Sequence, residues 1–200
     1  MLASFFDPEK IEAGCDEAGR GCLAGPVVAA AVILEKKFKH EVLNDSKQLS
    51  AEERDNLRQE IMDSALAYGI GVASPEEIDE INILNASYLA MHRAIDQLKI
   101  TPELLLIDGN RYKNHNETPY ECIIKGDGKY FSIAAASVLA KTYRDELMRK
   151  KALEYPGYSW ETNFGYPTPA HRQGIKDLGV TPLHRMSFQL LPIQMELFPE

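Results

Sequence analysis

The chain alternates apolar runs with polar or glycine-rich turns, and five of these runs predict β-strands. Residues 11–16 and 27–34 come first, separated by a turn that contains several glycines. Residues 68–73 form a third expected strand, although glycines weaken its pattern, and the short links favour an antiparallel meander. Two more strands are expected at 104–107 and 121–124. The run at 104–107 is apolar on both faces, which is typical of a central strand between helices.

Helices are predicted between and after these strands. The segment 50–53 has the serine–glutamate spacing of a capping box, and apolar residues over 84–98 repeat at steps of three and four. Residues 132–154 predict a long helix whose small side chains would let it lie close to the sheet. Threonine followed by proline at 168–169 begins another helix, and the same signal recurs at 181–182. The fold class is therefore α/β, with a helical C-terminal section.

Length and composition narrow the class of protein. The 200 residues fit one domain, which we place at 1–190, followed by a tail at 191–200. No apolar run approaches the roughly 20 residues that cross a bilayer, and residues 1–10 lack a signal-peptide pattern. The three cysteines have neither the number nor the spacing of a disulfide framework or a zinc site. We expect a cytoplasmic monomer that does not bind a membrane.

The net charge of −8 argues against a nucleic-acid partner when it is taken as a single number. Its distribution is more informative, because residues 125–185 hold ten Lys or Arg and six Asp or Glu, a balance of +4. The rest of the chain therefore carries −12. A basic section beside an acidic remainder is compatible with a polyanion that lies along one face of the molecule.

Three aspartates, Asp16, Asp108 and Asp127, each stand at or near the end of a predicted strand and close to a glycine. A lone Asp-Gly usually only caps a turn, but Asp16 is followed by Glu17 and a glycine-arginine-glycine turn. Carboxylates gathered at one sheet edge would repel one another unless cations balanced them. Two divalent ions ~3.5–4 Å apart would do so and would also support hydrolysis. Because the acidic set includes no His and the cysteines lack the spacing of a zinc site, Mg²⁺ or Mn²⁺ is favoured over zinc.

Several blocks of the sequence resemble the ribonuclease HII family. They occur in the family's order from about residue 11 to residue 188, which is nearly the whole chain. The blocks are GCDEAGRG at 14–21 with its continuation LAGPVV at 23–28, NDSKQL at 44–49, IDGN at 107–110, KGD at 125–127 and AAASVLAK at 134–141.

This resemblance implies a ribonuclease H-like fold, a mixed five-stranded sheet flanked by helices. It also implies a two-metal endonuclease that cuts the RNA strand of RNA–DNA hybrids. Such an enzyme would nick on the 5′ side of single ribonucleotides in duplex DNA and leave 3′-hydroxyl and 5′-phosphate ends. By motif, two Mg²⁺ or Mn²⁺ ions and the catalysis would depend on one acidic set: Asp16, Glu17, Asp108 and Asp127.

The resemblance also assigns substrate contacts. The turn that would probe the 2′-hydroxyl, the group that distinguishes RNA from DNA, consists of Gly19, Arg20 and Gly21. Tyr166 would pack on the sugar at the RNA–DNA junction, and the phosphate contacts would be Ser46 and Lys47. Simpler interpretations stay open for three of these residues: Arg20 paired with a neighbouring carboxylate, Lys47 as a solvated loop charge and Tyr166 as a surface aromatic.

Three polar residues outside this set have simpler interpretations. We expect Asp145 to be a charge on the surface of a helix, paired with Arg149 one turn away. His171 and His184 lie in the basic section, and their spacing indicates no hydrolytic role. We interpret both histidines as structural residues or as neighbours of a phosphate.

The tail resembles the short peptide by which bacterial replication and repair proteins bind the sliding clamp. The relevant residues are Gln194, Leu197 and Phe198, of which the last two would enter an apolar pocket. The alternative is that they pack back on the domain.

Two other functions stay open from sequence alone. One is a DNA nuclease or recombinase on the same fold, which the glycine-arginine-glycine turn disfavours. The other is a non-catalytic adaptor that binds hybrids or a clamp, for which a clustered negative site would have no use.

Overall fold

A computed structural model of the chain describes residues 2–43 and 50–192. Its core is a mixed five-stranded sheet with the strand order β3-β2-β1-β4-β5. The first three strands pair antiparallel, as predicted, although the link between β2 and β3 is long and contains a helix, whereas β4 and β5 continue from β1 in parallel. The bounds are β1 (Glu12–Ala18), β2 (Val27–Ile33), β3 (Ala67–Ala73), β4 (Leu104–Asp108) and β5 (Tyr120–Ile123).

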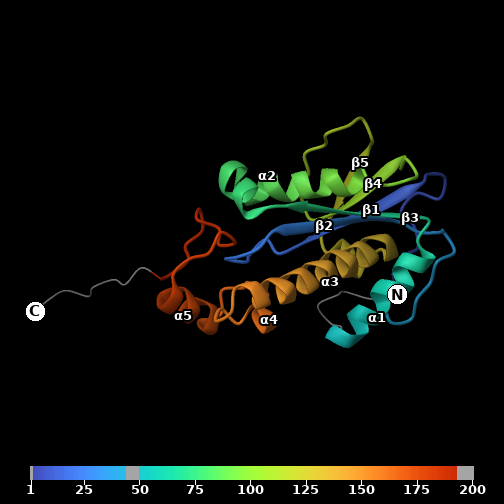
Figure 1. The fold of residues 1–200 in the computed structure, drawn as a ribbon. Coiled ribbons are helices and arrows are strands. Elements are labelled where there is room, and N and C mark those ends of the chain that lie inside the picture. The colour runs from blue at the N-terminus through green and yellow to red at the C-terminus, as the bar shows by residue number, and fades with distance from the viewer. Residues whose placement is uncertain (1, 44–49, 193–200) are drawn as a thin grey trace, which may run out of the picture.

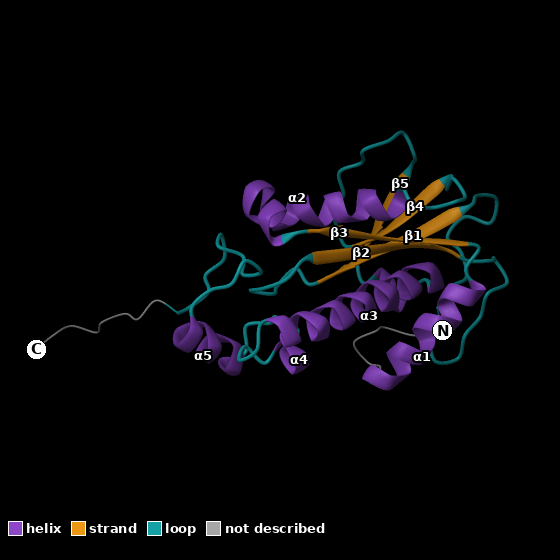
Figure 2. Cartoon of the chain, viewed as in Figure 1, coloured by secondary structure: helices purple, strands orange, loops and turns teal. Residues whose placement is uncertain are grey.

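Helices cover both faces of the sheet (Figure 1 and Figure 2). One face is covered by α2 (Pro75–Ile95), and the other by α3 (Phe131–Glu154) with α1 (Ala51–Ser64) beside it. The short helices α4 (Trp160–Asn163) and α5 (Pro169–Leu178) lie beyond the C-terminal end of α3. A single 3-10 turn, η1 (Gly126–Gly128), connects β5 to α3. The mixed sheet flanked by helices and the helical C-terminal section are both confirmed.

Small residues allow the helices to lie directly on the sheet. A Cβ added to Gly69 or Gly71 of β3 would come within 2.1 Å of a backbone oxygen of α2. On the other face, a Cβ added to Gly14 of β1 would lie 2.2 Å from the backbone carbon of Ser132 in α3. Every residue of β2 is buried between the two layers. The glycines that weaken the strand pattern of β3 are therefore packing positions.

The helix starts follow their capping residues. Ser50 and Glu53 form the predicted capping box of α1, and Thr168 caps α5 by accepting the N–H of His171 at 3.2 Å. A second capping box at Ser74 begins α2 about ten residues before the apolar repeat at 84–98. The sequence interpretation overlooked this capping box, which is separated from the apolar repeat by a kink at Asn82, where φ is 65°.

The helix predicted from the signal at 181–182 is wrong. The N–H of Thr181 donates instead to Nδ1 of His184 at 2.9 Å, which closes a single turn. The chain then runs alongside the loop between β1 and β2, where the N–H of Gly25 donates to the Leu183 carbonyl at 2.8 Å. Tertiary pairing therefore overrides the local start signal.

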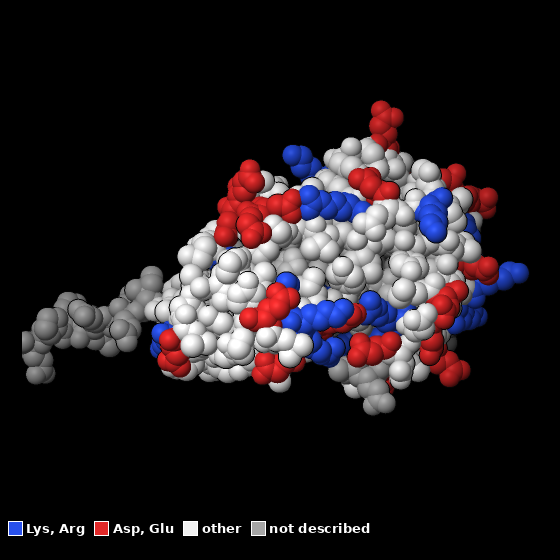
Figure 3. Space-filling view, viewed as in Figure 1, with Lys and Arg blue, Asp and Glu red and all other residues white. Residues whose placement is uncertain are grey.

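Charges are unevenly spread over the surface. Figure 3 shows acidic side chains gathered over one end of α2 and a band of Lys and Arg, with acids among them, over α3. Within residues 125–185, two of the ten cations (Arg144 and Arg185) and two of the six acids (Asp127 and Asp145) are buried. The exposed balance of this section therefore stays at +4.

Candidate active site

The parallel pairing of β1 with β4 brings the first acidic residues together. Cys15 lies opposite Ile107 in the register, so the residues that follow, Asp16 and Asp108, emerge side by side at the same sheet edge. Glu17 follows Asp16 on β1. Side chains from chain positions about 90 residues apart thus meet because parallel strands end at one edge.

Asp127 lies next to this edge but not in the same cavity. It is buried in η1, and one of its carboxylate oxygens accepts the N–H of Gly128 at 3.1 Å. The preceding Gly126 donates its N–H to Oδ1 of Asp108 at 2.7 Å, which ties η1 to the end of β4. The structure therefore brings Asp16, Glu17 and Asp108 together in one cavity. Asp127 lies outside that cavity and directly follows Gly126, the residue that donates to Asp108.

A cavity of about 310 Å³ opens at this edge. Its walls come from the end of β1, the glycine loop that follows, β4, α1, α3 and the segment before α5. It is lined by Asp16, Glu17, Ala18, Gly19, Arg20, Gly21, Arg54, Asp108, Ser137, Lys141 and Tyr166.

The carboxylates in this cavity have an unfavourable environment on their own. Burial raises the pKa of Asp16 well above its usual range, and the nearby Glu17 and Asp108 raise it further. Hydrogen bonds from Ser137 and from the N–H of Glu17 act in the opposite direction. Burial also raises the pKa of Glu17, against the effect of Arg20. The site concentrates negative charge that a cation would stabilise.

Glu17 provides the clearest sign of a missing partner. Its Oε1 accepts a hydrogen bond from Nη1 of Arg20 at 3.0 Å, so the simple pairing considered for Arg20 is present. Its Oε2 is buried without a hydrogen-bond partner in the described residues. A buried carboxylate oxygen in an all-oxygen donor set is the environment that Mg²⁺ or Mn²⁺ prefers. The side chains as they stand in residues 2–43 and 50–192 nevertheless include no ready-made group of three metal ligands.

Two buried arginines donate hydrogen bonds to backbone carbonyls of the glycine loop, residues 19–26 between β1 and β2. The guanidinium of Arg144 in α3 donates to the carbonyl oxygens of Ala24 at 3.0 Å, Pro26 at 2.9 Å and Phe164 at 2.8 Å. Arg185 donates to the carbonyl oxygens of Gly19 and Arg20 at the start of the loop and to that of Gly25 near its end. Neither was identified from the sequence, where both simply add to the basic section.

Tyr166 lies at the mouth of the cavity and is 37% exposed. Its ring lies 5.6 Å from Nζ of Lys141 and 5.9 Å from the guanidinium carbon of Arg144. The preceding Gly165 accepts the N–H of Leu23 through its carbonyl at 2.8 Å, so this segment is bonded to the glycine loop. Tyr166 and the glycine-arginine-glycine turn therefore face one cavity, as the resemblance predicts.

Sequence reasoning missed several cavity residues. Ser137 and Lys141 lie four residues apart on one face of α3, inside the motif block at 134–141, to which the sequence analysis assigned no role.

Asp145 was expected at the surface beside Arg149, but it is buried and accepts a hydrogen bond from Nζ of Lys141 at 2.6 Å. The partner of Asp145 is one helical turn away, as predicted, but it is Lys141, four residues before it, and not Arg149, four residues after it.

Some predicted residues cannot be placed. Ser46, Lys47, Gln194, Leu197 and Phe198 lie outside the described residues. His171 and His184 are fully buried in the C-terminal section, which confirms that they are structural.

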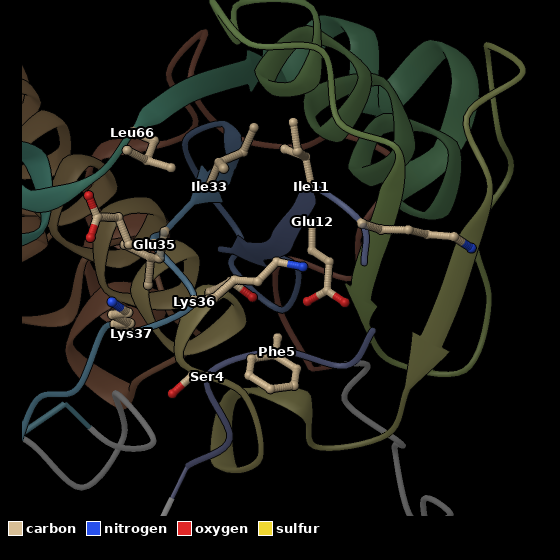
Figure 4. A pocket seen from close by; sticks show the side chains of 12 residues that line it. Ser4, Phe5, Ile11, Glu12, Ile33, Glu35, Lys36, Lys37 and Leu66 are labelled. Carbon is tan, nitrogen blue, oxygen red and sulfur yellow. The ribbon is translucent and has the colours of Figure 1, made fainter. Parts of the chain in front are cut away.

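A second cavity, of about 360 Å³, lies at the other end of β1 (Figure 4). Glu12 points into it, roughly 13 Å along the strand from Asp16. Its carboxylate accepts the N–H of Phe6 at 2.9 Å, and Nζ of Lys36 donates to the Asp7 carbonyl at 3.2 Å. Because these groups are satisfied by the N-terminal segment, we interpret the cavity as the place where that segment packs.

Comparison with known proteins identifies the family. The sequence pattern of the family described as Ribonuclease HII matches residues 13–191. Ribonuclease HII of Bacteroides fragilis (strain NCTC 9343) is 62% identical over 199 residues, which are 99% of each chain. The chain belongs to the ribonuclease HII family. It is therefore an endoribonuclease, and its reaction is the metal-dependent cleavage of RNA in RNA–DNA hybrids.

Solved structures confirm the fold. Ribonuclease H2 of Pyrococcus horikoshii OT3 superposes with a TM-score of 0.76 at 27% identity and covers 90% of this chain and 94% of its own. The ribonuclease HII in a complex with PCNA from Archaeoglobus fulgidus gives a TM-score of 0.70 at 25% identity, over 94% and 100% of the two chains. Membership of the family rules out a DNA nuclease or recombinase, and a non-catalytic adaptor, as the main function. No helix in the described part of the chain is long and apolar enough to cross a membrane.

Proposed function

We propose that this ribonuclease nicks duplex DNA on the 5′ side of a single embedded ribonucleotide, and leaves 3′-hydroxyl and 5′-phosphate ends. One observation carries the proposal. Three carboxylates, from Asp16, Glu17 and Asp108, share a cavity with a glycine loop whose backbone is open at Gly21. A site for hydrolysis and a surface that can approach a ribose thus lie side by side.

The acidic set would hold two Mg²⁺ or Mn²⁺ ions. Asp16, Glu17 and Asp108 would bind them from the cavity wall, and Asp127 would complete the set from η1. When bound, two such ions activate the attacking water and stabilise the leaving oxygen of the phosphodiester. The chain itself supplies placement: Ser137 and the N–H of Glu17 orient Asp16, and the N–H of Gly126 orients Asp108.

Recognition of the ribonucleotide would come from the turn Gly19, Arg20 and Gly21 together with Tyr166. An open backbone can donate an N–H to the 2′-hydroxyl, and a half-exposed aromatic ring can pack on a sugar. Lys141 and Arg54 line the same cavity, and their charges favour a phosphodiester there. Ser46 and Lys47 would add phosphate contacts from the segment before α1.

The tail is proposed as a separate partner site. Residues 1–190 would form the catalytic domain, and 191–200 would bind a sliding clamp through Gln194, Leu197 and Phe198. The similar ribonuclease HII from Archaeoglobus fulgidus has been solved in complex with PCNA, which supports a clamp as the partner. A monomer in the cytoplasm stays our prediction.

The test of the proposed reaction is a DNA duplex that carries one ribonucleotide, incubated with the enzyme and Mg²⁺ or Mn²⁺. We expect one nick, on the 5′ side of the ribonucleotide, with 3′-hydroxyl and 5′-phosphate ends when the products are mapped. An identical all-DNA duplex should stay intact. Cleavage on the 3′ side, or cleavage of the all-DNA duplex at a similar rate, would contradict the proposal.

A further inference from the structure

Arg185 is fully buried and lies 160 or more residues along the chain from the loop that it contacts. Its Nε donates to the Gly25 carbonyl at 2.9 Å, Nη1 to the Arg20 carbonyl at 2.9 Å and Nη2 to the Gly19 carbonyl at 2.7 Å. In the described part of the chain it forms no ion pair with a carboxylate. Burying a guanidinium without a directly paired carboxylate is unfavourable, and the charge of Asp79 compensates for it only from beyond ion-pair distance, so stability alone does not account for an arginine here.

The segment around Arg185 is fixed from two sides. Its N–H donates to the Leu23 carbonyl at 2.9 Å, which pairs the segment with the glycine loop. The carboxylate of Asp79 in α2 accepts the N–H of Met186 at 2.8 Å and that of Ser187 at 2.9 Å. The guanidinium therefore has a fixed position relative to both the loop and the helix layer.

The contacts of Arg185 determine where two amide groups of the loop point. Carbonyl and N–H lie on opposite sides of a trans peptide, and no described peptide bond is cis. With the carbonyls of Gly19 and Arg20 turned inward to Arg185, the N–H groups of Arg20 and Gly21 face outward. Neither N–H donates to an acceptor within residues 2–43 and 50–192. Both residues are exposed and line the cavity of the acidic set.

We propose that Arg185 is a positioning residue for ribonucleotide recognition. It fixes two peptide planes of the glycine loop so that the N–H groups of Arg20 and Gly21 donate to the 2′-hydroxyl of the substrate. This inference rests on the proposed function, because it assigns the residue that prepares the loop for that contact.

The planar fork of arginine suits this role. Three N–H directions are fixed relative to one another, so three carbonyls can be held at once. A lysine would keep the charge but not the fork. Arg185→Lys is therefore the informative variant, and Arg172→Lys is a matched control. Arg172 also donates to two backbone carbonyls of the C-terminal section, those of Gln189 and Leu190, but does not contact the loop.

The experiment measures kcat and KM in Mg²⁺ on a duplex with one ribonucleotide, and the inhibition constant of the same duplex made entirely of DNA. For Arg185→Lys we expect KM to rise at least fivefold while the inhibition constant changes less than twofold. A residue with only a structural role would change both constants together. Arg172→Lys should leave both within twofold of the wild type. Equal changes in the two constants, or no change in a folded Arg185→Lys, would overturn the proposal.

A measurement on the wild type covers the case in which Arg185→Lys does not fold. Amide hydrogen exchange at Arg20 and Gly21 should slow at least tenfold on binding the ribonucleotide duplex, and much less on binding the all-DNA duplex. Equal protection by both duplexes would overturn the inference. A wild type that does not nick 5′ of the ribonucleotide would instead show that the proposed function has failed.

Discussion

The loop between β1 and β2 contains three glycines, and the structure gives a different reason for glycine at each position. Gly19 has φ of 94°, and an added Cβ would lie 2.1 Å from Nε of Arg144. Gly25 has φ of 83°, and its added Cβ would lie 2.4 Å from the sulfur of Met148. Gly21 has neither constraint, because its φ is not in the left-handed region and no atom of residues 2–43 and 50–192 lies within 4 Å of an added Cβ. The fold explains two of these glycines, and the third leaves the backbone accessible.

We expect Gly21→Ala to fold normally and to lose about tenfold or more of kcat/KM on ribonucleotide-containing DNA. The methyl group would hold the substrate away from the backbone, and small displacements are costly in a nuclease site. Gly19→Ala is the contrasting variant, which should lose about 1–3 kcal/mol of unfolding free energy because of its left-handed φ. Urea unfolding and kinetics on both variants separate the effects. Wild-type kcat/KM in Gly21→Ala would contradict a direct role for the open backbone.

Single residues of the site differ in how far the sequence could predict them. Asp16 and Asp108 were identified because the end of a strand is a local pattern, and the parallel register then places them together. Lys141 has a local signal only in its helical spacing from Ser137, which gives a shared face but not the cavity that this face lines. Arg185 has no local signal, because its role exists only when the C-terminal segment lies against the glycine loop.

Among the elements, the C-terminal section is held by a buried network of rings. Trp160 donates its Nε1–H to Nε2 of His171 at 2.9 Å, so His171 carries its proton on Nδ1 and donates it to the Tyr166 carbonyl at 3.0 Å. His184 accepts the N–H of Thr181 through Nδ1, so its proton lies on Nε2, 3.2 Å from Nε2 of His171. Both histidines are neutral in this arrangement, and it also fixes the position of Tyr166 at the cavity.

This network predicts a loss of stability in acid. Burial, followed by the neighbouring His171, lowers the pKa of His184 from 6.5 to about 4. Between these values the unfolded chain binds a proton that the folded chain does not, so stability is complete above pH 6.5 and falls as the pH drops towards 4. The loss from this residue is at most about 3 kcal/mol.

The measurement is the free energy of unfolding in urea at pH 7.5 and pH 4.5, for the wild type and for His184→Gln. Glutamine does not titrate, so the variant should lose less stability between the two pH values than the wild type does. Carboxylates contribute equally to both proteins and cancel in the comparison. An identical loss in the two proteins would contradict the neutral network.

Elements could be predicted where their signals are local. Capping pairs located α1 and α5, and the apolar run at 104–107 located β4. The start of α2 also has a local signal, the capping box at Ser74, but it was overlooked because the kink at Asn82 separates it from the apolar repeat, and α4 is too short, at four residues, to show a periodicity. The turn at 181–184 imitates a helix start, and only its pairing with the glycine loop shows otherwise.

At the scale of the whole molecule, the sheet and its two helix layers position the active-site residues at the edge where β1 and β4 end. Strands β1 and β4 deliver the carboxylates, α3 supplies Ser137 and Lys141 from one layer, and the C-terminal section supports the glycine loop. The overall charge of −8 is no obstacle to an anionic substrate, because the exposed part of residues 125–185 keeps a positive balance. Sequence and structure agree on this distribution, since equal numbers of cations and acids are buried there.

The most direct test of the account is the Mg²⁺ dependence of cleavage by Asp108→Asn on a duplex with one ribonucleotide. The asparagine oxygen can still accept the N–H of Gly126, so the melting temperature should change by only a few degrees, whereas the lost charge should lower kcat at least a hundredfold at saturating Mg²⁺. Asp177→Asn, on the surface of α5, serves as the control with unchanged kcat. A folded Asp108→Asn that cleaves within twofold of the wild-type rate would contradict the claim that these carboxylates hold the metal ions.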